Sequence, residues 1–175
     1  MPQVNKLGHP AQRAAEIIRD AGGRVVGRTR LQKIAYLLEL SGVGTGFHFE
    51  YRHYGPYCED LTSAIRSANR LGIAKEEEHP TSWGGFYSIF TTELASSGEA
   101  LPGRIELVQK AASADPIELE LAATAAFLFS VGEVDPWGET ERRKPEKAKD
   151  RLERAKTLYA SLRRIHTPLP LPDLS

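Results

Sequence analysis

Hydrophobic residues in the first forty positions recur three to four residues apart, which is the spacing of one face of a helix. The segment from His9 to Ala21 follows this pattern and ends at Gly22-Gly23, so it predicts a first helix. A second helix is predicted from Thr29 to Gly42, where Thr29 and Gln32 stand at the spacing of an N-terminal capping box. Its buried face should be formed by Leu31, Ile34, Ala35 and Leu38.

Strand patterns flank this second helix. Arg24 to Gly27 is a short extended segment, and Phe47 to Tyr54 alternates aromatic with polar residues, as half-buried strands do. The Gly55-Pro56 pair predicts a turn, because glycine frees the backbone just before proline fixes it. Pro56 then favours the start of a third helix, where its missing N–H costs nothing, and Gly72 should end that helix.

The next segment has the pattern of a β-hairpin. Ile73 to Glu78 and Phe86 to Thr92 form the predicted arms, with Trp83 near the turn. The acidic run from Glu76 to Glu78 lies in the first arm, where neighbouring side chains point to opposite sides. A solvated face is therefore favoured over a carboxylate site. Helix, helix, strand, helix and hairpin is the element order of a winged-helix module, which implies no function by itself.

The rest of the chain is predicted to be mostly helical. One helix runs from Pro102 or Gly103 to about Ala112, and a second opens at Pro116 and is apolar on most sides. A long amphipathic helix covers Lys147 to Ile165. The proline-rich tail, residues 167–175, is expected to be extended and loose.

These elements predict a mainly α fold with a small antiparallel β-sheet, that is, an α+β protein. No repeat or linker divides the chain, so residues 1–175 should form a single domain. Within it, residues 1–95 form a winged-helix-like module, and residues 96–166 form a helical part packed on that module.

Charge is balanced over the chain but unevenly placed along it. The 175 residues hold 23 Lys/Arg and 23 Asp/Glu. Residues 1–72 hold 10 basic against 6 acidic residues, 73–136 hold 3 against 11, and 137–166 hold 10 against 5. A neutral chain has no overall attraction for nucleic acid, and the acidic middle would repel phosphate and could attract a basic partner.

The sequence predicts a cytoplasmic protein that is not associated with a membrane. No apolar run reaches the roughly 18–20 residues that span a bilayer. The start, MPQVNKLGHP, lacks the apolar core of a signal peptide. Cys58 is the single cysteine, which excludes an internal disulfide.

The familiar patterns of catalytic and metal sites are missing from the sequence. There is no glycine-rich phosphate loop, Gly-x-Ser-x-Gly elbow or His-Glu-x-x-His pair, and the five histidines show no ligand spacing. Cys58 could have a lowered thiol pKa in the first turn of the predicted third helix, but a structural, partly buried cysteine is favoured. We expect no enzyme activity, no cofactor and no metal, with an unrecognised enzyme as the least favoured class.

Two segments, GRTRLQKIAYLLEL and FHFEYRHYGPYCEDLTSAI, carry a family resemblance. A Leu-Gln-Lys helix with a tyrosine in its next turn, followed by an aromatic strand ending in Gly-Pro, resembles the bacterial YwgA family. The pattern more distantly resembles the SocA-like antitoxins with the Panacea domain. The later WGETERRKPEKAKDRLERA is also similar to the C-terminal segment of YwgA-type proteins. The residues that carry the main pattern are Leu31, Gln32, Lys33, Tyr36, Tyr54, Gly55 and Pro56.

The resemblance implies a binding role and a mostly helical fold with a small sheet. Panacea-type proteins resemble a scaffold that neutralises varied toxins by direct contact, often encoded beside them. We therefore expect an antitoxin-like or phage-defence-associated adaptor whose partner is a protein, for example a toxin encoded nearby. The predicted contact residues are Lys33, Tyr36, His53, Tyr54, Gly55, Pro56 and Tyr57.

Several of these residues also have a purely structural interpretation. Gln32 can simply complete a helix cap, and Gly55-Pro56 can be only a turn and a helix start. Tyr36 can be half-buried with its hydroxyl in water, as amphipathic rings often are.

A winged-helix DNA-binding regulator is the alternative function. The third helix would then read DNA, using its polar side: Arg66, Ser67, Asn69 and Arg70. Glu59 and Asp60 at the front of that helix, and an acidic hairpin where a basic wing is expected, argue against this alternative.

Overall fold

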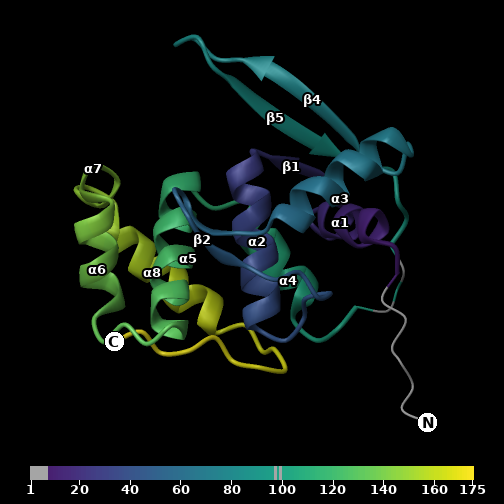
Figure 1. The fold of residues 1–175 in the computed structure, drawn as a ribbon. Coiled ribbons are helices and arrows are strands. Elements are labelled where there is room, and N and C mark those ends of the chain that lie inside the picture. Colours follow the sequence, from purple (N-terminus) through teal and green to yellow (C-terminus); the bar gives the residue numbers. More distant parts are fainter. Residues whose placement is uncertain (1–7, 97, 99) are drawn as a thin grey trace.

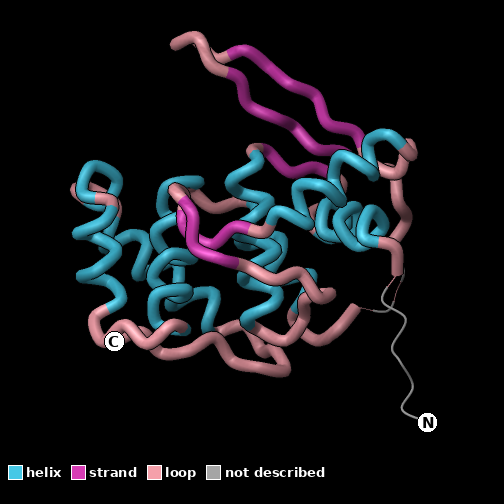
Figure 2. Tube along the Cα trace, viewed as in Figure 1, coloured by secondary structure: helices cyan, strands magenta, loops and turns pink. Residues whose placement is uncertain are grey.

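The computed structural model describes residues 8–96, 98 and 100–175 and has the predicted α+β fold (Figures 1 and 2). The N-terminal part contains three helices and two small antiparallel sheets. In chain order its elements are α1 (Pro10–Asp20), β1 (Arg24–Val26), α2 (Arg28–Leu40), β2 (Glu50–Arg52), β3 (Gly55–Tyr57), α3 (Glu59–Arg70), β4 (Lys75–Pro80) and β5 (Phe86–Thr91). The helices that follow are α4 (Arg104–Ala112), α5 (Pro116–Ser130), α6 (Pro136–Arg143), α7 (Pro145–Ala148) and α8 (Leu152–Arg163).

The larger sheet has the strand order β1-β5-β4, and all its pairs are antiparallel. Phe90 of β5 faces Val25 of β1 on one side and Glu76 of β4 on the other. The β4–β5 hairpin, called the wing below, projects well beyond the helices (Figure 1). Strands β2 and β3 form a separate hairpin between α2 and α3.

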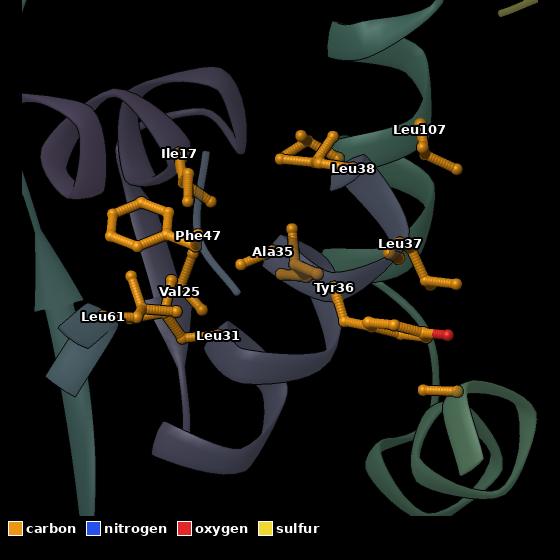
Figure 3. Packing of buried hydrophobic residues seen from close by; sticks show 14 of the residues in the cluster. Ile17, Val25, Leu31, Ala35, Tyr36, Leu37, Leu38, Phe47, Leu61 and Leu107 are labelled. Atoms are coloured by element: carbon orange, nitrogen blue, oxygen red, sulfur yellow. The ribbon is translucent and has the colours of Figure 1, made fainter. Parts of the chain in front are cut away.

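Helix α2 forms the centre of the core. Every residue from Leu31 to Leu38 is buried, because the helix packs against α4 and α5 as well as β1 and β3. The helices α1 and α3 lie together on one side of it, and α5 to α8 lie on the other (Figure 1). Figure 3 shows Leu31, Tyr36 and Leu38 among the side chains that fill this core. Helix α5 is buried from Leu119 to Ala126, as its nearly uniform apolar pattern predicted.

The capping box predicted at Thr29 and Gln32 is wrong. Helix α2 begins at Arg28, and Gly27 occupies the cap position without any side-chain hydrogen bond to the helix. Gln32 lies one turn into the helix and is buried, and its amide bonds to the chain at Cys58 instead.

The prediction that Pro56 opens the third helix is also wrong. Gly55, Pro56 and Tyr57 form strand β3, in register with Arg52, Tyr51 and Glu50, and α3 starts only at Glu59. Tertiary hydrogen bonds from α2, described below, fix this segment in the extended form and override the local preference of Pro56 for a helix start.

The proline-rich tail is packed on the body of the protein, contrary to the prediction that it is loose. Leu171 and Leu174 are buried, the Tyr159 hydroxyl donates to the Pro172 carbonyl (2.7 Å), and the Leu169 N–H donates to the Ser41 carbonyl (3.0 Å). Prolines carry no N–H, so an extended proline-rich segment leaves few backbone donors to satisfy when it packs outside a sheet.

Candidate functional site

The Gln32-Lys33 pair of α2 holds strand β3 by its main chain. Gln32 Nε2 donates to the Cys58 carbonyl (2.9 Å), and Gln32 Oε1 accepts the Cys58 N–H (2.8 Å). Lys33 Nζ donates to the Pro56 carbonyl (2.8 Å). A primary amide offers both a donor and an acceptor, so Gln32 satisfies Cys58 as a neighbouring strand would. We call these two side chains the α2 clamp.

Lys33 is an unusual member of this clamp because it is almost fully buried, with 1% of its surface exposed. Desolvation lowers the pKa of its ammonium group to about 7, against the attraction of Glu120, which raises the pKa. Lys144 and Lys147 lower it further by repulsion. Lys33 therefore changes its protonation state near neutral pH, while its hydrogen bond to Pro56 needs only an N–H.

Further lysines support the β2–β3 hairpin from α7 and from the residue between α6 and α7. Lys144 Nζ donates to the His53 carbonyl (2.9 Å), and Lys147 Nζ pairs with the buried carboxylate of Glu120 (2.6 Å). Lys147 also lies 4.8 Å from the centre of the Tyr54 ring, at the tip of the hairpin. The hairpin is thus held from beneath, and its tip points outward.

The structure divides the predicted contact residues into two groups. Lys33, Tyr36, Gly55 and Pro56 are buried, so they offer no open surface to a partner. The accessible group is His53, Tyr54 and Tyr57.

Tyr36 belongs to the core rather than to a surface. Its ring packs against Phe49 and Phe127, with centroid distances of 5.4 and 5.8 Å, and burial raises the pKa of its hydroxyl to about 12. Tyr54, by contrast, is 58% exposed. Tyr57 is half-buried, and its hydroxyl lies 2.9 Å from Thr62 Oγ1 and 3.1 Å from a carboxylate oxygen of Glu59.

Beside the hairpin tip lies a groove of about 640 Å³, which we call the wing groove. It is bounded by the wing, the first turns of α2, the first two turns of α3 and the β2–β3 hairpin. Leu31, Leu61, Ile65 and Phe90 supply its apolar floor, and all four are buried. The groove joins segments that are more than fifty residues apart in the chain.

Exposed aromatic side chains line the rim of the wing groove. Trp83 at the wing tip is 81% exposed, and Phe86 at the start of β5 is 70% exposed. Together with Tyr54 and Tyr57 from the β2–β3 hairpin, they place two aromatic residues on each side of the groove. Large aromatic groups left in water around an apolar floor are typical of a surface that binds another molecule.

The register of the wing decides which of its side chains enter the groove. Phe86, Ser88 and Phe90 alternate along β5 and share one face, and Glu76 and Glu78 of β4 lie opposite Phe90 and Ser88 on that face. Tyr87 lies on the other face, where its ring stacks on His79 at 5.5 Å. As predicted for the acidic run, neighbouring glutamates point to opposite sides: Glu77 pairs with Lys75 at 2.6 Å, away from the groove.

Arginine side chains stand at three positions around the groove, and two of them are already paired. Arg28 Nη2 lies 2.9 Å from Glu76 Oε2 and 3.0 Å from Glu78 Oε1. Arg52 pairs with Glu50 at 2.5 Å, and its guanidinium lies 5.4 Å from the centre of the Tyr57 ring. Arg66 of α3 is exposed and forms no ion pair with any described residue.

The residues predicted to read DNA are differently placed. Arg66 and Arg70 are exposed on α3, but only Arg66 lines the groove. Asn69 accepts the Glu76 N–H through Oδ1 (3.2 Å), which ties α3 to the wing, and half-buried Ser67 accepts a bond from Arg70 (3.3 Å).

Sequence reasoning missed Trp83, Phe86, Arg28 and Arg52 as site residues. Trp83 lies near the predicted turn, and two glycines follow it. A large aromatic residue at a glycine-rich hairpin tip has no core to enter, so this position was the signal available in the sequence. The arginines carried no such signal, because their role depends on the folding together of distant segments.

Other features of the structure limit the kinds of site that the described residues can form. Among them, no group of three His, Cys, Asp or Glu side chains could hold a metal ion. No described helix combines the length and hydrophobicity that a membrane span requires. Cys58 is buried beneath the hairpin, and burial raises the pKa of its thiol, as expected of a structural cysteine.

The fold and the groove define an α+β protein with a projecting wing and an aromatic-rimmed groove beside it. In sequence, the chain is similar to the uncharacterized protein YwgA of Bacillus subtilis (strain 168), with 28% identity over 85 residues. The aligned part is 49% of this chain and 49% of that protein, so the match spans about half of each. No protein-family model matches the chain. No solved structure matches it either. The predicted resemblance to YwgA is therefore supported over about half of the chain, while the relation to SocA-like antitoxins and the Panacea domain stays a prediction.

Proposed function

We propose that this protein is a non-enzymatic protein-binding module that neutralises or regulates a partner protein, as an antitoxin or a defence-associated adaptor does. The observation that carries the proposal is the wing groove, where exposed Trp83, Phe86 and Tyr54 surround a buried apolar floor. Tyrosine and tryptophan give large contact areas and dominate the binding energy of many protein interfaces. The rigid support of the β2–β3 hairpin by the α2 clamp agrees with this role, because a preorganised surface loses less entropy on binding.

The test begins by finding the partner and ends with purified proteins. The chain is used as bait in cells of its natural host, beside a Trp83→Ala/Phe86→Ala variant and a Tyr87→Ala control. Tyr87 is the neighbour of Phe86 on the opposite face of β5, so it controls for the general loss of an exposed aromatic group. The captured protein is then expressed alone and titrated by calorimetry, and its effect on growth is compared with and without the chain.

We expect direct binding by the wild-type chain and by Tyr87→Ala. Binding should weaken at least about thirtyfold in the double variant, which corresponds to roughly 2 kcal/mol. Co-expression of the wild type should relieve any growth arrest that the partner causes, and co-expression of the double variant should not. Equal affinity of the double variant and the wild type, or the lack of any purified partner that binds, would overturn the proposal.

A further inference from the structure

We propose that the wing groove takes a short segment of the partner protein that carries one carboxylate side chain next to a bulky apolar one. The inference rests on the proposed function and specifies the chemistry of the partner. The apolar side chain would lie on the groove floor, and the carboxylate would pair with Arg66.

The apolar half of the occupant follows from the floor and the wing. Leu61 and Ile65 lie one turn apart on α3, and Phe90 faces them from β5. Exposed Phe86 adds a further apolar group on the same face of the strand, nearer the wing tip. An aromatic or long aliphatic side chain placed there would cover surface that is now in water, which is the main source of affinity at such anchors.

The charged half follows from the balance of charge in the groove. The lining residues include three exposed arginines, Arg28, Arg52 and Arg66, against one carboxylate, that of Glu76, although the whole chain is neutral. An anionic group is therefore favoured over a cationic one. Arginine suits a carboxylate especially well, because its planar group can bind both oxygens at once.

The number of available cations favours one carboxylate over a nucleic acid. Arg28 and Arg52 are occupied by Glu76, Glu78 and Glu50, and buried Lys33 is bonded to the Pro56 carbonyl. A row of phosphates would need several unpaired cations. If the arginines left their ion pairs to bind phosphate, the glutamates left behind would repel it. Among the described lining residues, Arg66 is the exposed cation that needs no partner to be displaced.

The size of the groove favours a short segment. A volume of about 640 Å³ lies within the range of sites that enclose a drug-sized molecule. A few consecutive residues of the partner would fill it, and the rest of the partner would contact the surrounding surface.

The test uses a displayed library of short random peptides selected on the purified wild-type chain, with counter-selection on the Trp83→Ala/Phe86→Ala variant. Selected peptides are synthesised with a fluorescent label and titrated by polarisation. Each is compared with a version in which Asp or Glu is replaced by Asn or Gln. Arg66→Glu is titrated beside Arg70→Glu, a control for the same charge change one turn further along α3 and outside the groove. Melting curves confirm that both variants fold, and Arg66→Gln replaces Arg66→Glu if the latter does not.

We expect the selected peptides to place an acidic residue beside an aromatic or long aliphatic one. The amide versions should bind at least about tenfold more weakly. Arg66→Glu should lose binding to the acidic peptides and gain binding when their acid is replaced by lysine, while Arg70→Glu should change little.

Two results would overturn the inference and leave the proposed function standing. One is a set of selected peptides that need Trp83 and Phe86 but show no preference for an acid. The other is a selected acidic peptide whose affinity is the same for Arg66→Glu and the wild type. Tighter binding of a labelled single-stranded oligonucleotide than of any peptide, abolished by Arg66→Glu, would overturn both the inference and the proposed function. If no peptide is enriched, the inference fails, and the titration of the whole partner protein decides the proposed function separately.

Discussion

Gln32 and Lys33 are neighbours on α2, yet each bonds to a different set of main-chain groups in the facing segment. Cys58 has both an N–H and a carbonyl to satisfy, and the amide of Gln32 supplies one acceptor and one donor. Pro56 has only a carbonyl, because proline lacks an N–H, and Lys33 is a pure donor. The chemistry of each side chain in the pair is therefore set by the main chain that it holds.

The lowered pKa of Lys33 predicts how stability depends on pH. In the unfolded chain this lysine has an ordinary pKa near 10.4, whereas burial lowers the pKa to about 7 in the folded protein. Between these values the unfolded state binds more protons, so the free energy of unfolding rises with pH. The cost of burying the charge is fully present below pH 7 and is gone above the unfolded pKa. We expect a gain relative to Lys33→Met of up to about 1.4 kcal/mol per pH unit above pH 7.

Urea unfolding of the wild type and Lys33→Met at several pH values between 7 and 9 measures this gain. The comparison with Lys33→Met is needed because other groups titrate in both proteins. Burial lowers the pKa of Lys144, which adds a rise of the same sign, and raises the pKa of Cys58, which adds an opposing fall. Parallel curves for the two proteins would show that Lys33 has the same pKa in both states.

The tyrosines around the hairpin should differ sharply in their effect on stability. Tyr54→Ala removes a ring that is mostly in water, so the melting temperature should stay almost unchanged. Tyr57→Ala removes a half-buried ring and its bond to Thr62, and should cause a moderate drop. Tyr36→Ala empties a site in the core and should cost about 3–5 kcal/mol.

Thermal unfolding of the three single variants gives this order directly. A large drop for Tyr54→Ala would mean that its ring is part of the core in solution, and it would remove Tyr54 from the contact surface.

Strand β3 can lie on α5 only because residue 55 has no side chain. Gly55 has φ +91°, in the region that favours glycine, and a Cβ at this position would collide with Thr124 Oγ1 of α5. We predict that Gly55→Ala destabilises the protein by about 2–4 kcal/mol, the sum of backbone strain and overpacking. In Gly55→Ala/Thr124→Ala the collision is relieved and only the strain remains.

The double-mutant cycle of unfolding free energies separates these two terms. We expect the loss of unfolding free energy in the double variant to be smaller than the summed losses of the two single variants, by at least about 1 kcal/mol. Additive losses would mean that the strand does not approach Thr124 closely. Thr124→Ala alone is a suitable partner for the cycle, because Thr124 Oγ1 has no hydrogen-bond partner among the described residues.

The C-terminal tail should contribute to stability as a packed element. Leu171→Ala and Leu174→Ala each remove a buried side chain and should cost about 2 kcal/mol or more. Leu169→Ala is the matched control, since Leu169 is 58% exposed and its change should cost clearly less. Equal, small losses for all three in urea unfolding would restore the original expectation of a loose tail.

At the scale of the molecule, the hydrophobic periodicity of the sequence predicted most helices and strands well, but it predicted the contacts between them poorly. The helix predicted to open at Pro116 is α5, and the predicted arms of the wing are within two residues of β4 and β5, because these patterns are local. The Gly55-Pro56 strand was missed since its conformation is fixed by α2, more than twenty residues earlier in the chain. Four of the seven predicted contact residues are buried, since their surroundings come from distant segments. Lys33, for example, bonds to a distant carbonyl, which no spacing rule reveals.

The wing groove itself could not be predicted, because it exists only when α2, α3 and the two hairpins come together. The sequence indicated Tyr54 and Tyr57 through the motif around Gly55-Pro56, and Arg66 through the polar face of the predicted third helix. Trp83 and Phe86 became candidates only when the structure showed that they remain exposed beside an apolar floor.

The charge of the whole molecule gives the last prediction, which concerns DNA. We expect no tight, sequence-selective binding to the DNA upstream of the protein's own gene at physiological salt, because binding of that kind depends on several cations that neutralise phosphates. The chain is neutral, and the surface between α3 and the wing, which a winged-helix protein would turn toward DNA, holds mixed charge. Arg28 is tied to Glu76 and Glu78 there, while Glu59 and Asp60 are exposed at the start of α3.

A mobility-shift assay with the upstream fragment and a shuffled fragment of equal length measures the prediction. The wild-type chain should give no shift at nanomolar concentration, and any shift at low salt should be equal for the two fragments and vanish as salt is raised. Arg66→Ala/Arg70→Ala serves as the control for the exposed cations of α3. A nanomolar shift that is specific to the upstream fragment and is lost in this variant would mean that α3 reads DNA, and the regulator would then replace the protein-binding module as the function of this fold.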